Sequence, residues 1–397
     1  MNRSRRKSQK AAVPPVLLFV VNVDWFFLSH RLPLALAAKE AGFRVIVAAA
    51  NSGVAGVIEK AGLEFRQIHL NRGTSNPLRD LRLIIELLTL FRKLRPQLIH
   101  HVTIKPVLYG SLVSRLFPRS SVINAISGLG FVFTETGRAQ TLRRIIMPLY
   151  RLALRRPRSY VIVQNPHDVE LLIAQNLITK QQAVLIRGSG VDCRKFAPSP
   201  QPRGAPIVML ASRLLWDKGV GEFVEAARQL GTVIPSARFV LVGDPDPGNP
   251  ACIASETIAE WVKEGDVEWW GWREDVAAVL RQASIVVLPS YREGLPKVLL
   301  EAAATACPIV TTDVPGCREI VRHGVNGVLV PPRDSAELAK AIELLLHSPA
   351  LREQYGSAGR DIAVSEFAVE IVVEQTMDVY RSLLGDRWPS LSKKEDE

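Results

Sequence analysis

The sequence predicts an α/β protein of two doubly wound domains that face each other across a cleft. Strand-like and helix-like segments alternate along both halves of the chain, which is typical of parallel sheets covered by helices on both faces. A proline-rich stretch at 191–205 interrupts the alternation and indicates a linker. With 397 residues, of which 47% are hydrophobic, the chain is long and apolar enough for two cores.

The first domain is predicted over residues 13–190, after a basic tail at 1–12 that we expect to be disordered. Short apolar runs predict its strands, and longer runs that end in glycine or proline predict its helices. The strands are expected at 16–23, 43–50, 64–70, 97–103, 121–127 and 159–165, and the helices at 28–42, 52–62 and 76–96.

The second domain, predicted over 206–372, repeats the pattern. Its strands are expected at 206–212, 237–244, 267–272, 284–290, 308–313 and 326–332, and its helices at 219–230, 256–265, 273–283 and 297–306. A helix at 373–388 is expected to pack back on the first domain, before a disordered tail at 389–397. Ligands of doubly wound sheets bind outside the carboxyl ends of the strands, so we expect the site in the cleft.

Charge separates the two halves. Residues 1–200 carry a net charge of +20 and residues 201–397 one of −9, which sum to the +11 of the whole chain. The segment Leu142–Arg158 mixes arginine with apolar residues at near-helical spacing, which fits a segment lying on an anionic membrane surface. A solvated arginine face on a surface helix is the alternative. Without a nucleic-acid-binding motif, the basic charge does not indicate a nucleic-acid partner.

Cysteine use and hydropathy favour a cytoplasmic protein. The four cysteines form no CxxC motif or Cys/His cluster, which argues against a zinc site and a disulfide framework. The apolar run at 16–23 is broken by Asn22 and followed by Asp24, with no small-residue cleavage site, so we expect a buried strand rather than a signal peptide. No apolar run reaches the roughly 18 residues of a membrane-spanning helix.

Two cations flank a strand-to-helix loop of the second domain. Arg213 follows the strand at 206–212, and Lys218 stands just before the next helix. Two fixed cations beside a helix start can hold a diphosphate, to which the helix amides also contribute. Two ordinary surface cations are the alternative.

Two carboxylates stand eight positions apart at a second such junction. Glu293 follows the strand at 284–290, and Glu301 lies inside the helix at 297–306. Glu301 can accept hydrogen bonds from the vicinal hydroxyls of a ribose, and Glu293, at the cleft mouth, from those of a sugar. Solvated helix-surface glutamates are the alternative. Backbone amides that would face an anion here belong to Gly294, Leu295 and Lys297.

These stretches closely resemble glycosyltransferase family 4, retaining enzymes with two facing Rossmann-like domains (the GT-B fold). The resemblance covers almost the whole chain and is carried by SRLLWDKG, EGLPKVLLEAAATACPIVTTDVPGCREIV and NGVLVPPRD. It implies that Arg213 and Lys218 bind the donor diphosphate, that Glu293 faces the donor sugar and that Glu301 binds the ribose.

The segment WWGWRED lies where this family holds the nucleotide base. The resemblance therefore makes Gly271, Trp272 and Arg273 base-site candidates. GSGVD, at 188–192, resembles the family's interdomain segment, and we interpret it as a hinge turn.

The first half resembles the branch that acts on bacterial surface polysaccharides and lipid-linked oligosaccharides, through IHHVTIKPVLYG and NAISGLGFVF. Many relatives read H-x-H at the first stretch, and their second histidine helps position the donor sugar. Val102 stands in that place here, so we assign no such role to His101. The acceptor-side candidates are His30, Thr103, Lys105, Gly128 and Gly130. A satisfied helix-start histidine at His30 and a plain tight turn at the two glycines are the alternatives.

We therefore expect a retaining glycosyltransferase that moves an N-acetylhexosamine or hexose from a UDP-sugar to a lipid-linked or polysaccharide acceptor at the inner membrane surface. No metal and no cofactor are expected, because Arg213 and Lys218 can neutralise the leaving diphosphate. Asp244 and Asp246 imitate a D-x-D metal clamp but lie in a proline-rich loop. A sugar-nucleotide epimerase and a non-enzymatic membrane-surface protein are the alternatives.

Overall fold

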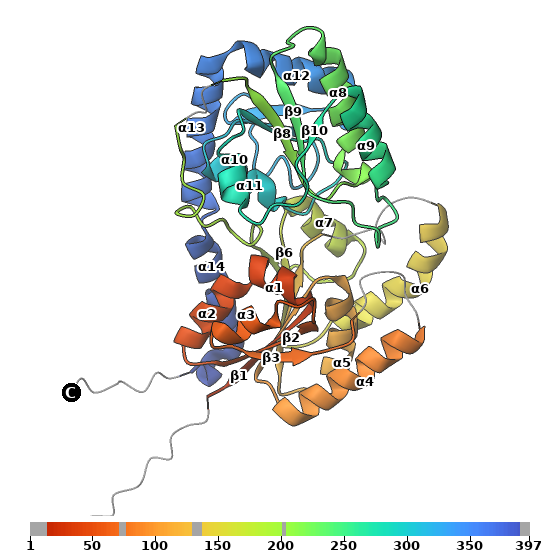
Figure 1. Ribbon diagram of the computed structural model, residues 1–397. Coiled ribbons are helices and arrows are strands. Elements are labelled where there is room, and N and C mark those ends of the chain that lie inside the picture. Colours follow the sequence, from red (N-terminus) through yellow and green to blue (C-terminus); the bar gives the residue numbers. More distant parts are fainter. Residues whose placement is uncertain (1–13, 71–76, 129–136, 201–203, 390–397) are drawn as a thin grey trace, which may run out of the picture.

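A computed structural model of the chain describes residues 14–70, 77–128, 137–200 and 204–389, with the side chains of 137–145 left out. Its two parallel sheets, one in each half, lie one above the other in Figure 1. This confirms the predicted fold class. The tails expected to be disordered, 1–12 and 389–397, lie outside the described residues except for Pro389.

The first sheet has the order β3-β2-β1-β4-β5-β6-β7, with every pairing parallel. Its strands are β1 (Val16–Val23), β2 (Arg44–Ala50), β3 (Glu64–Gln67), β4 (Leu98–Val102), β5 (Ser121–Ile126), β6 (Ser159–Val163) and β7 (Ala183–Leu185). Its helices are α1 (Asp24–His30), α2 (Leu32–Glu40), α3 (Ala55–Lys60), α4 (Pro77–Leu94), η1 (Pro106–Gly110), α5 (Ser111–Ser114), α6 (Gly137–Leu154) and α7 (Pro166–Ala174). The sequence did not reveal β7, which is only three residues long.

One predicted helix, at 28–42, is in fact the two helices α1 and α2. The chain leaves helical geometry at Arg31, with φ −132° and ψ −9°. Pro33 stands in the first turn of α2, where its missing N–H costs nothing, whereas inside a continuous helix its ring would collide with the preceding turn. The break leaves His30 at the end of α1.

The second sheet has the order β10-β9-β8-β11-β12-β13 and is also parallel. Its strands are β8 (Ile207–Ala211), β9 (Arg238–Val242), β10 (Glu268–Trp269), β11 (Ile285–Leu288), β12 (Ile309–Thr312) and β13 (Gly327–Val330). Its helices are η3 (Trp216–Lys218), α8 (Val220–Gly231), α9 (Ser255–Glu264), α10 (Val276–Leu280), α11 (Lys297–Ala304), α12 (Ser335–His347) and α13 (Pro349–Glu366).

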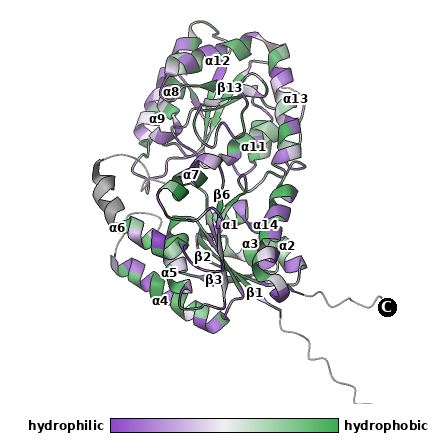
Figure 2. Cartoon of the chain, turned by 180° about the vertical axis from the view of Figure 1, so that it is seen from behind, coloured by the Kyte–Doolittle hydropathy of each residue, from purple (hydrophilic) through white to green (hydrophobic). Residues whose placement is uncertain are grey.

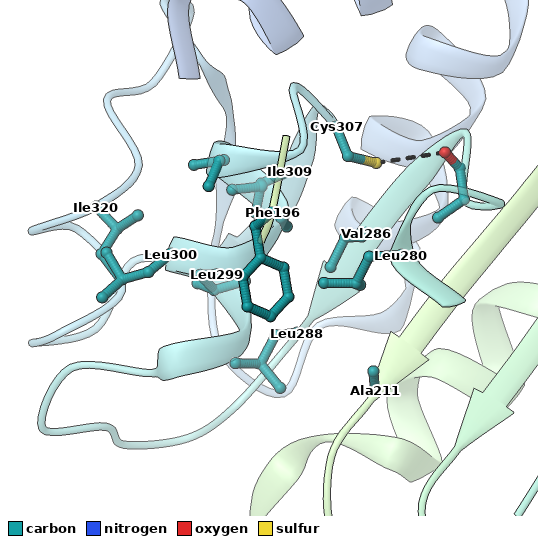
Figure 3. Packing of buried hydrophobic residues seen from close by; sticks show 14 of the residues in the cluster. Phe196, Ala211, Leu280, Val286, Leu288, Leu299, Leu300, Cys307, Ile309 and Ile320 are labelled. Atoms are coloured by element: carbon teal, nitrogen blue, oxygen red, sulfur yellow. Dashed lines mark hydrogen bonds between the residues drawn. The ribbon is translucent and has the colours of Figure 1, made fainter. Parts of the chain in front are cut away.

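The chain crosses between the domains twice, at neighbouring places. The Val191 N–H donates to Phe367 O at 2.9 Å, and the Val369 N–H donates to Val191 O at 2.9 Å. The first residues of the predicted linker therefore pack against the second domain, because Val191 and Phe196 belong to its apolar core. Figure 3 shows the Phe196 ring among Leu299 and its neighbours.

The last long helix, α14 (Val369–Leu384), lies against the first domain, as Figure 1 shows, and the turn η4 (Gly385–Arg387) follows it. It begins four residues earlier than the expected 373. The physical reason is that Val372, like Tyr380, is buried in the core between α2 and the first sheet. The second domain thus ends near Phe367.

Candidate active site

Glu293 lies beyond the carboxyl end of β11, on a loop that contacts the first domain. All four residues of β11 are buried and apolar, and polar residues start only after the strand. The Ser290 hydroxyl donates to Glu293 Oε1 at 2.7 Å, and the Lys218 ammonium bonds to the same oxygen. The Glu293 side chain is 11% exposed. The structure therefore brings together two of the predicted catalytic residues, as an ion pair.

Lys218 is held at this place by the loop after β8. The 3₁₀ turn η3 ends at Gly219, whose φ is +72°. A Cβ atom on Gly219 would lie 2.1 Å from Pro289 O, so only glycine lets this loop touch the chain leaving β11. The Tyr291 N–H also donates to Asp217 O at 3.0 Å. Adjacent strands thus deliver both charges of the pair.

Arg213 stands at the same sheet edge, with a partner of its own. Its Nη1 lies 2.6 Å from Asp246 Oδ2, and its side chain is 45% exposed. The neighbouring Asp244 accepts the Trp272 N–H at 3.1 Å. Both carboxylates of the apparent D-x-D motif are therefore bound by protein groups. Within the described ranges, no group of three or more His, Cys, Asp and Glu side chains is placed to hold a metal.

Glu301 is buried in α11 behind this edge, with 7% of its surface exposed. Burial raises the pKa of its carboxyl, and the Lys297 ammonium, 3.3 Å from Oε1, partly opposes that rise. Lys297 also donates to Ser29 O of the first domain at 2.9 Å. The Lys297 side chain thus spans from Glu301 to α1. No side chain caps the start of α11.

The predicted base-site residues lie on the outer loops of the sheet. The Gly243 N–H, after β9, donates to Gly271 O at 2.8 Å, which fixes the chain leaving β10. Trp272 is 67% exposed, and Arg273 is exposed beside it. Both lie on the same loop edge as Arg213, which Asp244 and Asp246 connect to this segment.

Gly128 and Gly294 meet where the domains touch. A Cβ atom on Gly128 would lie 3.8 Å from the Gly294 Cα, and one on Gly294 would lie 2.1 Å from Ser127 O. Leu295 is buried beside them, and a Cβ atom on Gly188 of the hinge would lie 2.5 Å from its Cδ2. The structure thus brings the glycine-bearing loop after β5 against the Glu293 loop. Gly130 lies outside the described residues.

His30, from the first domain, lies close to the Lys297 charge. Its ring stacks on Phe26 with centroids 4.0 Å apart, and Nδ1 lies 2.5 Å from the Ser29 hydroxyl. Burial first, then the charges of Lys297 and Arg31, lower the pKa of His30 to about 3. The imidazole is therefore neutral at pH 7 and lies within the electrostatic influence of Lys297 from the second domain.

Thr103 and Lys105 follow β4 but meet different surroundings. Thr103 has φ +74°, and its buried hydroxyl has no hydrogen-bond partner among the described residues. Lys105 lies 3.2 Å from Asp80 of α4, whose carboxylate also accepts the Tyr109 hydroxyl at 2.9 Å. Lys105 therefore contacts α4 and not the Glu293 loop.

His100 and His101 lie inside the first domain, not in the cleft. His100 Nδ1 bonds to the Tyr380 hydroxyl of α14 at 2.5 Å, and His101 Nδ1 lies 2.9 Å from Asn124 Oδ1. Both rings are fully buried. Burial lowers the pKa of His101 to about 4.

Three residues that the sequence did not single out also reach this site. Asn165 and Asp168 start α7, and Arg292 precedes Glu293; they connect the two domains. A signal was present in Asn165-Pro-His-Asp168, because asparagine followed by proline and an acid is typical of a helix start. Nothing in the sequence indicated which loop it would meet.

Two protein-family models match the chain and divide it as the two sheets do. The model described as "Glycosyl transferase 4-like" matches residues 16–165, and "Glycosyl transferases group 1" matches residues 205–348. The chain belongs to the family 4 glycosyltransferases. The predicted family and enzyme class are confirmed.

Two curated relatives resemble this glycosyltransferase over most of its length. One relative is N,N'-diacetylbacillosaminyl-diphospho-undecaprenol alpha-1,3-N-acetylgalactosaminyltransferase of Campylobacter jejuni. The two sequences are 28% identical over 377 residues, and the alignment covers 89% of this chain and 97% of the relative. This chain is 24% identical over 323 residues to UDP-Gal:alpha-D-GlcNAc-diphosphoundecaprenol alpha-1,3-galactosyltransferase of Escherichia coli, which covers 78% of this chain and 81% of the relative.

Solved structures share the fold of this glycosyltransferase. Sucrose-phosphate synthase from Thermosynechococcus elongatus superposes with a TM-score of 0.79 at 22% identity, over 94% of this chain and all of the other. Anabaena HepE, solved with UDP and glucose, gives a TM-score of 0.74 at 20% identity, over 92% of this chain and 99% of the other. The two-domain architecture is thus that of known glycosyltransferase structures.

Proposed function

We propose that this glycosyltransferase is a retaining enzyme that moves an N-acetylhexosamine or hexose from a UDP-sugar to a polyprenyl-diphosphate-linked or polysaccharide acceptor in bacterial surface-glycan synthesis. The observation that carries the proposal is the Lys218–Glu293 ion pair at the cleft edge, with Arg213 and Glu301 on neighbouring elements. The names of the two curated relatives, which act on sugar-diphospho-undecaprenol acceptors, support the acceptor class.

The donor would bind by partner exchange. In the structure, Lys218 bonds to Glu293 and Arg213 bonds to Asp246. A diphosphate carries more charge than either carboxylate and can accept from both cations. Once it has displaced the carboxylates, Glu293 is free to accept hydrogen bonds from sugar hydroxyls, and Glu301 accepts those of the ribose. Binding of the donor diphosphate therefore places the donor sugar beside Glu293, the carboxylate that the diphosphate has displaced from Lys218.

Transfer then needs no covalent enzyme intermediate. The acceptor oxygen forms a bond to the anomeric carbon on the face from which the diphosphate leaves, and the hydroxyl proton passes to a departing phosphate oxygen. Arg213 and Lys218 stabilise the charge that develops on the diphosphate. Because these two cations supply this stabilisation, we propose that the enzyme works without a metal ion.

The first domain would meet the inner surface of the cytoplasmic membrane with α4 and α6. Leu78, Leu81 and Ile85 of α4 are 79%, 53% and 55% exposed, and Leu149 and Leu152 of α6 are 41% and 48% exposed. α5 contacts both helices, which Figure 2 shows on one side of the molecule. Apolar side chains on a basic domain fit an anionic lipid surface. Within the described ranges, none of the helices combines the length and the hydropathy that a membrane-spanning segment needs.

The test combines binding with transfer. UDP-, GDP- and ADP-sugars are screened for a rise in melting temperature, which ligand binding to the native state must produce. We expect a rise with UDP-sugars that Lys218→Ala and Glu301→Ala abolish, while Lys340→Ala, on the exposed face of α12, preserves it. The active donors are then offered synthetic N-acetylglucosaminyl-diphospho-undecaprenol, and the linkage is read by NMR.

Several outcomes would contradict this proposal. A β-linked product would exclude retention of an α-linked donor, and loss of activity with EDTA that Mg²⁺ restores would exclude metal independence. Conversion of the donor sugar to an epimer without acceptor would indicate an epimerase. Vesicle binding without any sugar-nucleotide binding would indicate a membrane-surface protein that is not an enzyme.

A further inference from the structure

Two buried side chains at the start of α7 bind the loop that carries Glu293. Asn165 is fully buried, and its Nδ2 donates to Gly294 O in the other domain at 2.9 Å. Asp168 is 2% exposed, and its Oδ1 lies 3.2 Å from Nη2 of Arg292. Arg292 and Gly294 are the chain neighbours of Glu293. The first domain therefore holds this loop on both sides of the acid.

The Glu293 loop is closely packed on both sides, so its backbone has little space to move. A Cβ atom on Gly294 would lie 2.1 Å from Ser127 O, and one on Gly316 would lie 2.6 Å from Gly294 O. The Gly294 peptide thus lies between the loop after β5 of the first domain and the segment after β12 of the second. Parting the domains would remove the Asn165, Asp168 and Ser127 contacts together.

The needs of α7 itself do not explain this arrangement. Asn165 Oδ1 accepts the Asp168 N–H at 2.8 Å, which caps the helix. Capping uses only that oxygen, and the Nδ2 amide makes two further bonds, to Asp168 Oδ2 at 3.1 Å within α7 and to Gly294 O in the other domain. An acid in a first helical turn is also favourable at a solvated surface. Asp168 is instead buried, and while Asn165 donates to its Oδ2, its charged partner Arg292 comes from the other domain.

We propose that Asn165, Asp168 and Arg292 form an interdomain clamp that positions Glu293, so that Glu293 reaches its working geometry only when the two domains are closed. The three are positioning residues, because they act through Glu293 and not on the donor. The clamp rests on the proposed function in one respect: it takes Glu293 to face the donor sugar. Opening the cleft would hydrate Asp168 without unfolding either domain.

The decisive variant is Asn165→Ser. Serine also caps helices, so α7 is preserved, but serine lacks the amide that donates to Gly294 O and to Asp168 Oδ2. We expect kcat for sugar transfer to fall about 100-fold, the effect of misplacing a reacting group by about 1 Å. The KM for the UDP-sugar and the affinity for UDP alone by calorimetry should stay at wild-type values, and the melting temperature should fall only slightly, because two buried hydrogen bonds are lost. Asp168→Asn should act in the same direction.

Small-angle X-ray scattering on the same proteins measures closure directly. We expect Asn165→Ser and Asp168→Asn to have a larger radius of gyration than the wild type without ligand. Combining Asp168→Asn with Arg292→Gln removes both charges, and this double variant should lose less kcat than the two single variants predict together. The matched control is Arg187→Gln, which removes the hinge-side pairs of Arg187 with Glu366 at 3.2 Å and Glu319 at 3.5 Å. Its kcat should match the wild type.

Wild-type kcat in Asn165→Ser and Asp168→Asn would overturn the clamp. So would a fall in kcat that runs parallel to losses of melting temperature and UDP affinity, because that pattern indicates a structural role. If the wild-type enzyme transfers sugar from no UDP-sugar, the proposed function fails instead. The scattering result still decides the clamp in that case, because an unchanged radius of gyration in both variants contradicts it.

Discussion

β4 and β11 occupy the same place in the two sheets, yet they carry polar residues differently. Each lies beside the first strand of its domain, where the strand order turns back. β4 has His100 and His101 within the strand, and both are buried and bonded to other parts of the first domain. β11 is apolar throughout, and its polar residues, which include Glu293, follow the strand. The histidines inside β4 are bonded within the first domain, and we expect the acid that follows β11 to act in the proposed reaction.

The strongest test of this difference is Glu293→Gln. The amide keeps the size of the side chain but removes the charge that pairs with Lys218 and that, in the proposed function, faces the donor sugar. We expect kcat for transfer to fall about 100- to 1,000-fold, the effect of losing one preorganised electrostatic group. Initial rates with a saturating UDP-sugar check this. Glu337→Gln, on the surface of α12, is the control, and an equal loss there would contradict the assignment.

His101→Gln should instead change stability and leave catalysis alone. The folded pKa of His101, about 4, lies below the ordinary 6.5, so the native state binds fewer protons than the unfolded chain. Its stabilising contribution is complete above pH 6.5 and is lost as pH falls towards 4, by about 3 kcal/mol in total.

Urea unfolding between pH 7.5 and 4 measures this dependence. His101→Gln should flatten the fall in unfolding free energy, while His347→Gln, whose side chain is 64% exposed, should leave it unchanged. A large loss of kcat in His101→Gln at pH 7.5, with stability intact, would place this histidine in the catalytic machinery and remove the contrast between β4 and β11.

Glu301→Gln sharpens the comparison within the second domain. This substitution should raise the stability of the fold but weaken the binding of the UDP-sugar. Burial raises the pKa of Glu301, so the folded state loses stability as pH rises from 4.5 through that raised pKa. The amide avoids this loss and should raise the melting temperature at pH 7.5. The KM for the UDP-sugar should rise about 10-fold, because a charge-assisted hydrogen bond to the ribose is weakened. An unchanged KM would exclude the ribose contact.

The smallest effect is expected at the exposed Arg213–Asp246 pair. If Asp246 competes with the diphosphate, Asp246→Asn frees Arg213 and should lower the KM for the donor. Exposed pairs contribute at most about 1 kcal/mol, which limits the change to about five-fold. Steady-state kinetics at two salt concentrations measure it. A higher KM would show that Asp246 helps to bind the donor.

Local patterns predicted much of this molecule. Apolar runs gave most strands of both sheets. Glu293 and Glu301 were singled out through the resemblance to family 4, because their spacing alone also fits solvated helix-surface glutamates. The contact between Asn165 and Gly294 was not predicted, because the two residues are 129 positions apart and belong to different domains. The same holds for Lys105, whose partner Asp80 lies on a different helix. Contacts made by distant segments leave no periodic trace in a sequence.

The position of α14 has a consequence for the order in which the protein is made. Synthesis delivers the first sheet early, and domains generally fold in that order. Here, however, Tyr380 and Met377 fill the core of the first domain, and they are added only after the whole second domain. The second domain is in effect an insertion whose two ends meet at Val191 and Val369. A nascent chain must therefore keep an unfinished core until its last helix leaves the ribosome.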